Sequence, residues 1–433
     1  MTIANLAAQA KEASILLADV KTDVKNNALA EIAKALKANS SEIIKANLSD
    51  LEDAEKNNLA APLLKRLKFD QAKIDEVCQG IESLIKLDDP VGQILNATEL
   101  AVGLELYKVS CPIGVIGVIF ESRPDALVQI STLCLKSGNA VILKGGSEAE
   151  KTNSILKKII AQTTEKNAIP TGWIQLLHTR QDVSAMLELD SSIDLIIPRG
   201  SNAFVKYIMD NTNIAVLGHA DGICHVYVDD SADIEMAVNI TTDSKCQYVS
   251  VCNAVETLLV HKDIAQAFLP KLKESLDKFN VELHGCKKTA KIIDVKPADE
   301  NEWKTEYLDY KLSVKIVDNI DQAIEHINTF GSGHTDVIIT SNTKNAEEFM
   351  NLVDSGDVFF NCSTRFSDGF RFGFGAEVGI STNKIHARGP VGLDGLVIYK
   401  YKLIGNGHTV TDFSNGKYKY THKKIEKDFN LGK

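Results

Sequence analysis

The sequence predicts an α/β protein with two doubly wound units and a small separate pair of strands. Apolar residues recur at helical spacing up to about residue 87, and short apolar runs then alternate with helical stretches as far as residue 375. Two segments outside this rhythm alternate polar and apolar residues, as half-exposed strands do. At 433 residues the chain is longer than one hydrophobic core normally serves, so more than one domain is expected.

The first block is predicted to be helical. Leu29, Ile32 and Leu36 fall on one helix face, and Asp88-Asp89-Pro90 ends the block. The chain does not open with a basic stretch followed by an apolar one, so we interpret its first residues as a helix and not as a signal peptide.

Continuous apolar runs then predict two parallel sheets. Runs without polar alternation suit strands buried on both faces and joined by crossover helices. We assign residues 1–103 and 113–235 to a nucleotide-binding unit and residues 236–375 to a second α/β unit. The expected strands are 113–120, 140–143, 173–177, 193–197, 214–217, 258–260, 313–317, 337–340 and 358–360.

The two alternating segments are expected to pair with each other. They lie within residues 104–112 and 388–410, and exposed strands so distant in sequence suit an oligomerisation flap. We therefore expect a homodimer or homotetramer. The lysine-rich tail, residues 411–433, is expected to be a solvated extension.

Composition excludes several classes of function. A net charge of −10 and a pI near 5.6 argue against nucleic acid or an anionic membrane as partner, and no apolar run approaches a membrane span. The eight cysteines include no Cys-x-x-Cys pair, so neither zinc nor another metal site is expected. Thiols in apolar contexts are typical of a reducing cytoplasm, where we expect the protein.

Cys252 is the principal candidate for chemistry. It stands in a small-residue turn, Val251-Cys252-Asn253-Ala254, directly before the apolar run Thr257–Val260. Such a turn can hold a sulfur rigidly while it faces a cleft, as a thiolate nucleophile requires. The alternative is a buried cysteine that acts only as a small apolar residue.

Strand ends supply further candidates. Lys144-Gly145-Gly146-Ser147 follows a strand and opens a helix, which favours an anion or simply makes a turn. Gly200-Ser201 also follows a predicted buried strand and opens a helix, which favours a phosphate group. His219, between two glycines, is either a base or a hydrogen-bonded cleft residue. The loop 369–377 either covers a ligand or packs as an Ω-loop.

Four motifs make the chain recognisable. Over about residues 5–405 it resembles the γ-glutamyl phosphate reductases, also called glutamate-5-semialdehyde dehydrogenases, of the aldehyde dehydrogenase superfamily. The motifs are Cys111–Pro124, Cys252–Val260, Gly331–Asp336 and Gly379–Leu393. Two departures are Tyr248-Val249-Ser250, where bacterial members usually have Arg-Pro-Gly, and Phe330, where the family usually has His or Tyr.

This resemblance implies an aldehyde dehydrogenase-like fold and an oxidoreductase of L-proline biosynthesis. NADPH would reduce L-glutamyl 5-phosphate to L-glutamate 5-semialdehyde and phosphate through a thioester on Cys252. Ser122 takes the position of the superfamily's oxyanion-binding asparagine. The chain carries no kinase domain, so the substrate would come from a separate glutamate kinase.

The resemblance also implies roles for other residues. Ser147 replaces the glutamate of NAD-preferring relatives, which favours NADP(H), and His219 replaces the water-activating glutamate, which makes it the candidate for handling phosphate. Cofactor contacts are expected from Lys144, Ser147, Gly200, Ser201 and Glu306. Substrate contacts are expected, by position alone, from Arg123, Asn253, Ser363, Thr364 and Arg365.

Three alternatives remain open on the sequence. The chain could be an aldehyde dehydrogenase for another acid, a cysteine acyltransferase or hydrolase that uses no nicotinamide, or an inactive scaffold. NADPH consumption with glutamyl phosphate discriminates among them.

Overall fold

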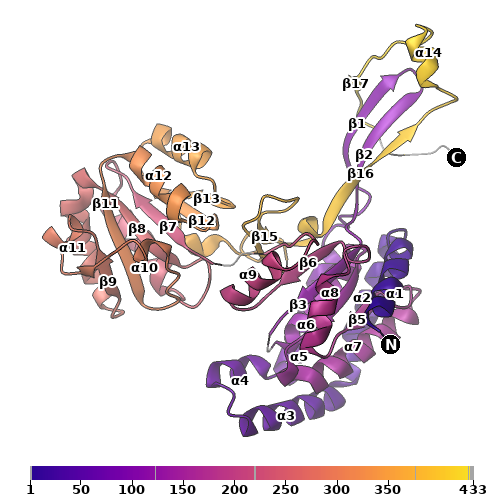
Figure 1. Cartoon of the computed structure of the whole chain (residues 1–433), viewed down its shortest axis with the longest axis horizontal. Helices are drawn as coiled ribbons and strands as arrows, with labels where there is room; N and C mark the ends of the chain where they lie inside the picture. The colour runs from indigo at the N-terminus through magenta and orange to yellow at the C-terminus, as the bar shows by residue number, and fades with distance from the viewer. Residues whose placement is uncertain (1, 122, 219–220, 376, 428, 430–433) are drawn as a thin grey trace. The chain divides into compact units, whose positions relative to one another are not determined.

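The structure is a computed structural model, which describes residues 2–121, 123–218, 221–375, 377–427 and 429. The chain divides into two compact units (Figure 1). The first unit comprises Met1–Gly200, Ile208–Val216 and Gly392–Lys433, and the second comprises Ser201–Tyr207 and Leu217–Val391. No helix in the described ranges is both long and apolar enough to cross a membrane.

Helices form the start of the first unit, as predicted. In α5 the apolar residues Ile74, Val77 and Ile81 are buried, and the Asp70 carboxylate caps the helix by accepting a hydrogen bond from the Lys73 backbone N–H at 3.1 Å. The five helices are α1 (Ile3–Leu17), α2 (Thr22–Ala38), α3 (Ser40–Lys56), α4 (Ala61–Leu67) and α5 (Gln71–Lys86).

A four-stranded parallel sheet in the order β5-β4-β3-β6 follows in the same unit. Because β4 and β6 flank β3 on opposite sides, the sheet has a topological switch point at the carboxyl end of β3, where doubly wound folds bind ligands. Its strands are β3 (Val115–Ile119), β4 (Ala140–Lys144), β5 (Ile174–Leu176) and β6 (Leu195–Pro198). The helices of this part are α6 (Pro124–Lys136), the short η1 (Ser147–Ala149), α7 (Glu150–Glu165) and α8 (Arg180–Leu187). The next helix, α9 (Asn202–Asp210), belongs to the second unit as far as Tyr207 and to the first unit from Ile208.

The strand expected at residues 214–217 is wrong. Val216 forms an isolated bridge with Ile196, Asn213 and Ile214 form a bend, and Ala215 and Leu217 are irregular. The run is apolar because Ile214 and Leu217 are buried, and residues of a loop can be buried as well as those of a strand.

The two alternating segments pair as predicted. β16 (Val397–Ile404) runs antiparallel to β2 (Leu104–Pro112), and β2 forms a hairpin with β1 (Ile94–Ala101), which was not predicted. The four-stranded order is β16-β2-β1-β17, where β17 is Lys423–Lys424. We call this sheet the flap.

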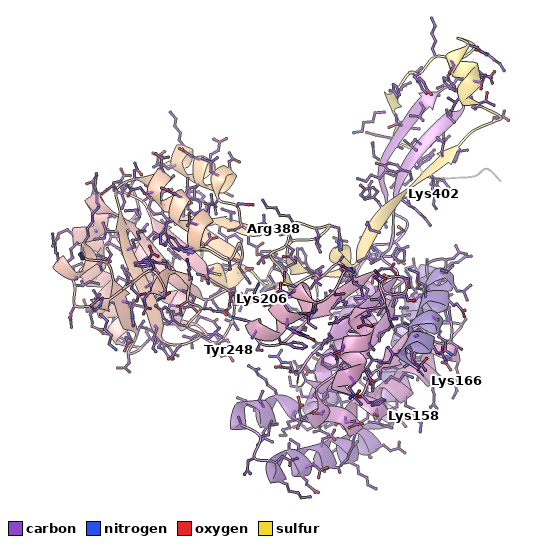
Figure 2. The ribbon with its side chains drawn as sticks, viewed as in Figure 1. Lys158, Lys166, Lys206, Tyr248, Arg388 and Lys402 are labelled. Carbon is purple, nitrogen blue, oxygen red and sulfur yellow. The ribbon has the colours of Figure 1, made fainter. Side chains whose placement is uncertain are left out.

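The tail is not a solvated extension. After the short helix α14 (Val410–Ser414), β17 pairs with β1, and Ile425 and Phe429 pack on the flap core around Tyr107. The rings of Phe429 and Tyr107 lie 5.4 Å apart, and the Lys402 ammonium, labelled in Figure 2, lies 4.3 Å from the Phe429 ring centroid. The prediction rested on the charge of the six lysines of this tail and overlooked its apolar residues.

The second unit is built on a seven-stranded parallel sheet in the order β10-β9-β11-β8-β7-β12-β13. Neighbouring residues of β8 point to opposite faces: Leu258 joins one apolar cluster with Phe268, and Leu259 joins another with Phe349. The strands are β7 (Cys224–Val228), β8 (Val255–His261), β9 (Glu282–Gly285), β10 (Lys296–Pro297), β11 (Lys311–Val317), β12 (Thr335–Ile339) and β13 (Asp357–Phe360).

Helices and short elements complete this unit. They are α10 (Ile234–Cys246), α11 (Lys262–Asp277), η2 (Thr289–Lys291), η3 (Glu302–Lys304), α12 (Ile320–Phe330), α13 (Thr343–Leu352), η4 (Thr364–Phe366) and the hairpin of β14 (Gly379–Ser381) with β15 (Gly389–Val391). The first unit resumes with η5 (Leu393–Leu396).

The boundaries of the second unit differ from the prediction. It begins at Leu217 and not at residue 236, because β7 pairs with β8 and β12 inside its sheet. It also continues to Val391 and not to residue 375, since β14 and β15 belong to it.

Candidate active site

Cys252 lies in the turn between α10 and β8 of the second unit. The Ala254 N–H donates to the Val251 carbonyl at 3.1 Å and closes this turn, while Ala254 and Val255 are fully buried. The thiol itself is half-buried. The turn is therefore fixed by the start of β8, and the Cys252 residue is only partly enclosed.

Gly222 packs directly against the backbone of Cys252. A Cβ placed on Gly222 would lie 2.5 Å from Cys252 Cα and 2.6 Å from Cys252 Cβ, closer than side chains pack. The Cys224 thiol donates to the Cys252 carbonyl oxygen at 3.1 Å from the same side. Glycine at this position permits the close approach that holds the cysteine turn against the segment leading into β7.

A histidine that the sequence reasoning missed touches the cysteine. His334 Nε2 lies 3.2 Å from Cys252 Sγ, and His334 Nδ1 lies 2.7 Å from Thr335 Oγ1. His334 is buried at the amino end of β12. The sheet order β8-β7-β12 brings the two residues together across one intervening strand, which spacing along the chain cannot reveal.

The surroundings of Cys252 favour the neutral thiol. Burial, together with the carboxylates of Glu306 and Glu377, raises the pKa of Cys252 to about 12, although the Arg365 cation acts to lower it. A thiol in these surroundings needs a proton acceptor to become a nucleophile.

The predicted substrate residues of this unit lie near one another. The Asn253 amide donates to the Ser367 carbonyl at 2.7 Å, and Ser363 Oγ accepts from Ser244 at 3.1 Å. Arg365 Nε donates to Gln247 Oε1 at 3.0 Å.

Two buried polar atoms, one in the Cys252 turn and one in η4, have no hydrogen-bond partner among the described residues. They are Asn253 Oδ1 and Thr364 Oγ1. Because buried polar atoms are normally paired, such atoms near a reactive thiol are available to a ligand. Arg123, the fifth predicted substrate residue, caps α6 in the first unit and is exposed.

Glu306 is held by Asn202 within the second unit. Asn202 Nδ2 donates to Glu306 Oε2 at 2.7 Å and to Asp221 Oδ1 at 2.6 Å. Asn202 opens α9, directly after the predicted pair Gly200 and Ser201, which are exposed.

The first unit contains a pocket where β4 leads into α7. Gly145, Gly146 and Ser147 line it, together with Glu150, Asn153, Leu176, Leu177 and His178. Lys144, at the end of β4, is buried and donates to the Gly145 carbonyl.

Asn153 is the second residue that sequence reasoning missed. It is 2% exposed, yet its Oδ1 has no hydrogen-bond partner among the described residues. Its position one turn into a helix, after the predicted glycines, could have suggested it. The pocket therefore offers a buried polar acceptor and a serine hydroxyl beside the apolar Leu176 and Leu177.

Two predicted residues, Ser122 and His219, lie outside the described residues. Within the described ranges, no group of three or more His, Cys, Asp or Glu residues is arranged to hold a metal ion.

Comparisons with known proteins agree on one family. A sequence model of the aldehyde dehydrogenase family matches residues 1–292. A curated Gamma-glutamyl phosphate reductase of Acetivibrio thermocellus is 66% identical over 431 residues, with 100% of each chain covered. The Gamma-glutamyl phosphate reductase of Methanococcoides burtonii is 53% identical over 430 residues, with 96% of each chain covered. The crystal structure of Gamma-glutamyl phosphate reductase from Thermotoga maritima superposes with a TM-score of 0.92 at 41% identity, covering 94% of this chain and 100% of that one.

Proposed function

Because the chain belongs to the aldehyde dehydrogenase family, in the branch of the γ-glutamyl phosphate reductases, we propose that it reduces L-glutamyl 5-phosphate to L-glutamate 5-semialdehyde with NADPH. It has the aldehyde dehydrogenase-like fold and is an oxidoreductase of that family. The observation that carries the proposal is the half-buried Cys252 thiol at the head of β8, in a turn fixed by Gly222. The product belongs to the biosynthesis of L-proline.

Cys252 is the nucleophile of this reaction. Its thiolate attacks the acyl carbon, the carbon–oxygen bond to phosphate breaks, and a thioester remains on the sulfur. NADPH, when bound, supplies the hydride that reduces this thioester. The resulting thiohemiacetal then collapses, which expels the thiolate and releases the aldehyde. The Cys252 backbone N–H is our candidate donor to the oxyanion of both tetrahedral intermediates, with Ser122 as a second donor.

The substrate's polar ends meet the loop that follows β13. The Arg365 cation favours a carboxylate or phosphate, and Asn253 Oδ1 is a free acceptor for the substrate's ammonium group. Thr364 Oγ1 is a further buried oxygen without a hydrogen-bond partner among the described residues, and a bound ligand would hydrogen-bond to it. Ser363 supports this loop through Ser244, and Arg123 is proposed from its position near the end of the motif Cys111–Pro124.

The pocket beside β4 fits the nucleoside part of NADP(H). Ser147 and Asn153 would hold it, with Lys144 and the glycine pair at its edge. Ser147 is a small neutral donor that leaves room for a 2′-phosphate, whereas a carboxylate there would repel it. Gly200, Ser201 and Glu306 are proposed to contact the pyrophosphate and the nicotinamide ribose.

The decisive experiment measures NADPH oxidation by the pure protein with freshly generated glutamyl phosphate. We expect substrate-dependent NADPH loss and release of phosphate, with Cys252→Ala as the blank. The reverse assay supplies glutamate 5-semialdehyde, NADP⁺ and phosphate. Absence of turnover in both directions would remove the assignment, and turnover of an acyl phosphate without NADPH would favour a hydrolase or acyltransferase.

Assembly and location complete the proposal. β16 is an edge strand of the flap, and its Tyr399, Tyr401 and Leu403 are exposed, so we propose that the flap joins subunits into a homodimer or homotetramer. A separate glutamate kinase would supply the substrate. All eight cysteines are free, as expected in the cytoplasm.

A further inference from the structure

We propose that His334 is the acid–base partner of Cys252, a catalytic residue that takes the thiol proton. The inference rests on the proposed function, in which Cys252 is the nucleophile. His334 Nε2 lies 3.2 Å from Cys252 Sγ, within the range of a hydrogen bond to sulfur. His334 is 1% exposed, so its ring is held in place and shielded from bulk water.

The thiol needs such a partner. The ionisable groups whose charges act on it are the carboxylates of Glu306 and Glu377, which oppose a negative sulfur, and the Arg365 cation, which supports it. Arg365 already gives its Nε hydrogen to Gln247 and does not hydrogen-bond the sulfur among the described contacts. An imidazole in contact with the sulfur accepts the proton and leaves a positive charge beside the thiolate, which offsets the carboxylates.

A chain of hydrogen bonds behind His334 orients the ring. Thr335 Oγ1 lies 2.7 Å from His334 Nδ1 and makes a long contact, 3.5 Å, with Asp357 Oδ2. Ser367 donates to the same carboxylate oxygen at 2.6 Å. When the single Thr335 proton points to the carboxylate, Thr335 Oγ1 accepts from Nδ1–H. The Nε2 lone pair then faces the thiol, which is the tautomer that a base requires.

The proton balance is complete. Cys252 gives its proton to His334 Nε2, and the sulfur lone pair forms the bond to the acyl carbon while phosphate leaves with the carbon–oxygen bonding pair. The departing phosphate takes one proton from water. After reduction, collapse of the thiohemiacetal oxyanion expels the thiolate, which recovers its proton from the His334 imidazolium. One proton is consumed overall, as the reduction of an acyl phosphate by NADPH requires.

The test measures the thiol directly as well as turnover. His334→Gln keeps the size and polarity of the side chain but removes the base. Alkylation of Cys252 by iodoacetamide is followed against pH, with the modified residue identified by mass spectrometry. We expect alkylation near neutral pH to slow about 10-fold or more, since one pKa unit is a factor of ten. We expect kcat to fall about 10²–10⁴-fold with KM little changed.

Three further variants control the experiment. His284→Gln removes a histidine of the same unit that hydrogen-bonds Glu282 on β9, and it should leave both readouts unchanged. Thr335→Val keeps the shape of the strand but removes the group behind Nδ1, so it should shift alkylation in the same direction by a smaller amount. His334→Ala should recover part of its turnover when imidazole is added. Thermal unfolding of each variant verifies folding.

The outcomes separate this inference from the proposed function. If the Cys252 thiol of His334→Gln is alkylated with the wild-type pH profile, the role of His334 is overturned, even where turnover is lost. Should His334→Gln not fold, the same result with Thr335→Val overturns it. If the wild type reduces no glutamyl phosphate but its alkylation depends on His334, the pairing stands and the proposed substrate falls.

Discussion

Replacement of Gly222 by alanine tests whether the position of Cys252 limits the reaction. The added Cβ would lie 2.5 Å from Cys252 Cα, about 0.9 Å short of the 3.4 Å at which ordinary contacts begin. The opposing atoms are the backbone carbonyl oxygen and Cα of Cys252 and the Cβ bonded to that Cα, so no side-chain rotation can relieve the overlap. One of the two segments must shift by nearly 1 Å.

Such a shift has a calculable consequence. A displacement of about 1 Å at a reacting group costs on the order of 10²-fold in rate, because the attacking atom leaves its productive geometry. The overlap itself costs about 1–3 kcal/mol of folding free energy, as an overpacked site does. We therefore expect kcat to fall about 100-fold in a protein that still folds.

The assay compares two glycine-to-alanine variants. Gly80 lies inside α5, and a Cβ there would meet nothing within 4 Å, so Gly80→Ala should keep full activity and gain about 0.5–1 kcal/mol of stability. Steady-state turnover, the rate of Cys252 alkylation and thermal unfolding are measured for both. Wild-type turnover in folded Gly222→Ala would refute the claim that this contact positions the thiol.

Three further predictions follow from the proposed function. Cys252→Ala should abolish reduction while Cys246→Ala stays active in the NADPH assay, and the opposite pattern would contradict the choice of nucleophile. Ser147→Glu should shift preference toward NADH, measured as the ratio of kcat/KM for the two cofactors; a wild type that prefers NADH would refute the reasoning. Oxidation of the semialdehyde should require phosphate, and His219→Glu should raise the KM for phosphate and allow hydrolysis. Turnover that is unaffected by omitting phosphate would disprove phosphorolysis.

Sequence patterns predicted the parts of the fold whose signals are local. The continuous run at Leu258–Val260 identified a strand buried on both faces, and the alternation in 104–112 identified a flap strand, because burial alone sets both patterns. β9 was missed because Glu282 and His284 interrupt its apolar residues. The division at Leu217 was missed because it depends on which sheet β7 joins, and strand order is set by packing between distant segments.

The residues of the candidate site likewise include some that local sequence could predict and others that only the fold reveals. Cys252 could be proposed because its turn and its strand adjoin in sequence, and Arg365 was proposed from its position alone. His334 lies 82 positions away and reaches the sulfur only through the order of three strands. Asn153 became a candidate only once its carbonyl oxygen was known to be buried without a partner among the described residues.

The pairing of the flap constrains how the chain is made. β2 ends at Pro112 and β16 begins at Val397, so about 285 residues emerge from the ribosome before the hairpin of β1 and β2 gains its third strand. At about 5–20 residues per second, this takes roughly 15–60 s. A two-stranded hairpin is only marginally stable in water, and the edge of β2 in this hairpin stays unpaired until β16 has been synthesised. The second unit, complete at Val391, can fold during that interval, and β17, which is synthesised after β16, pairs with β1.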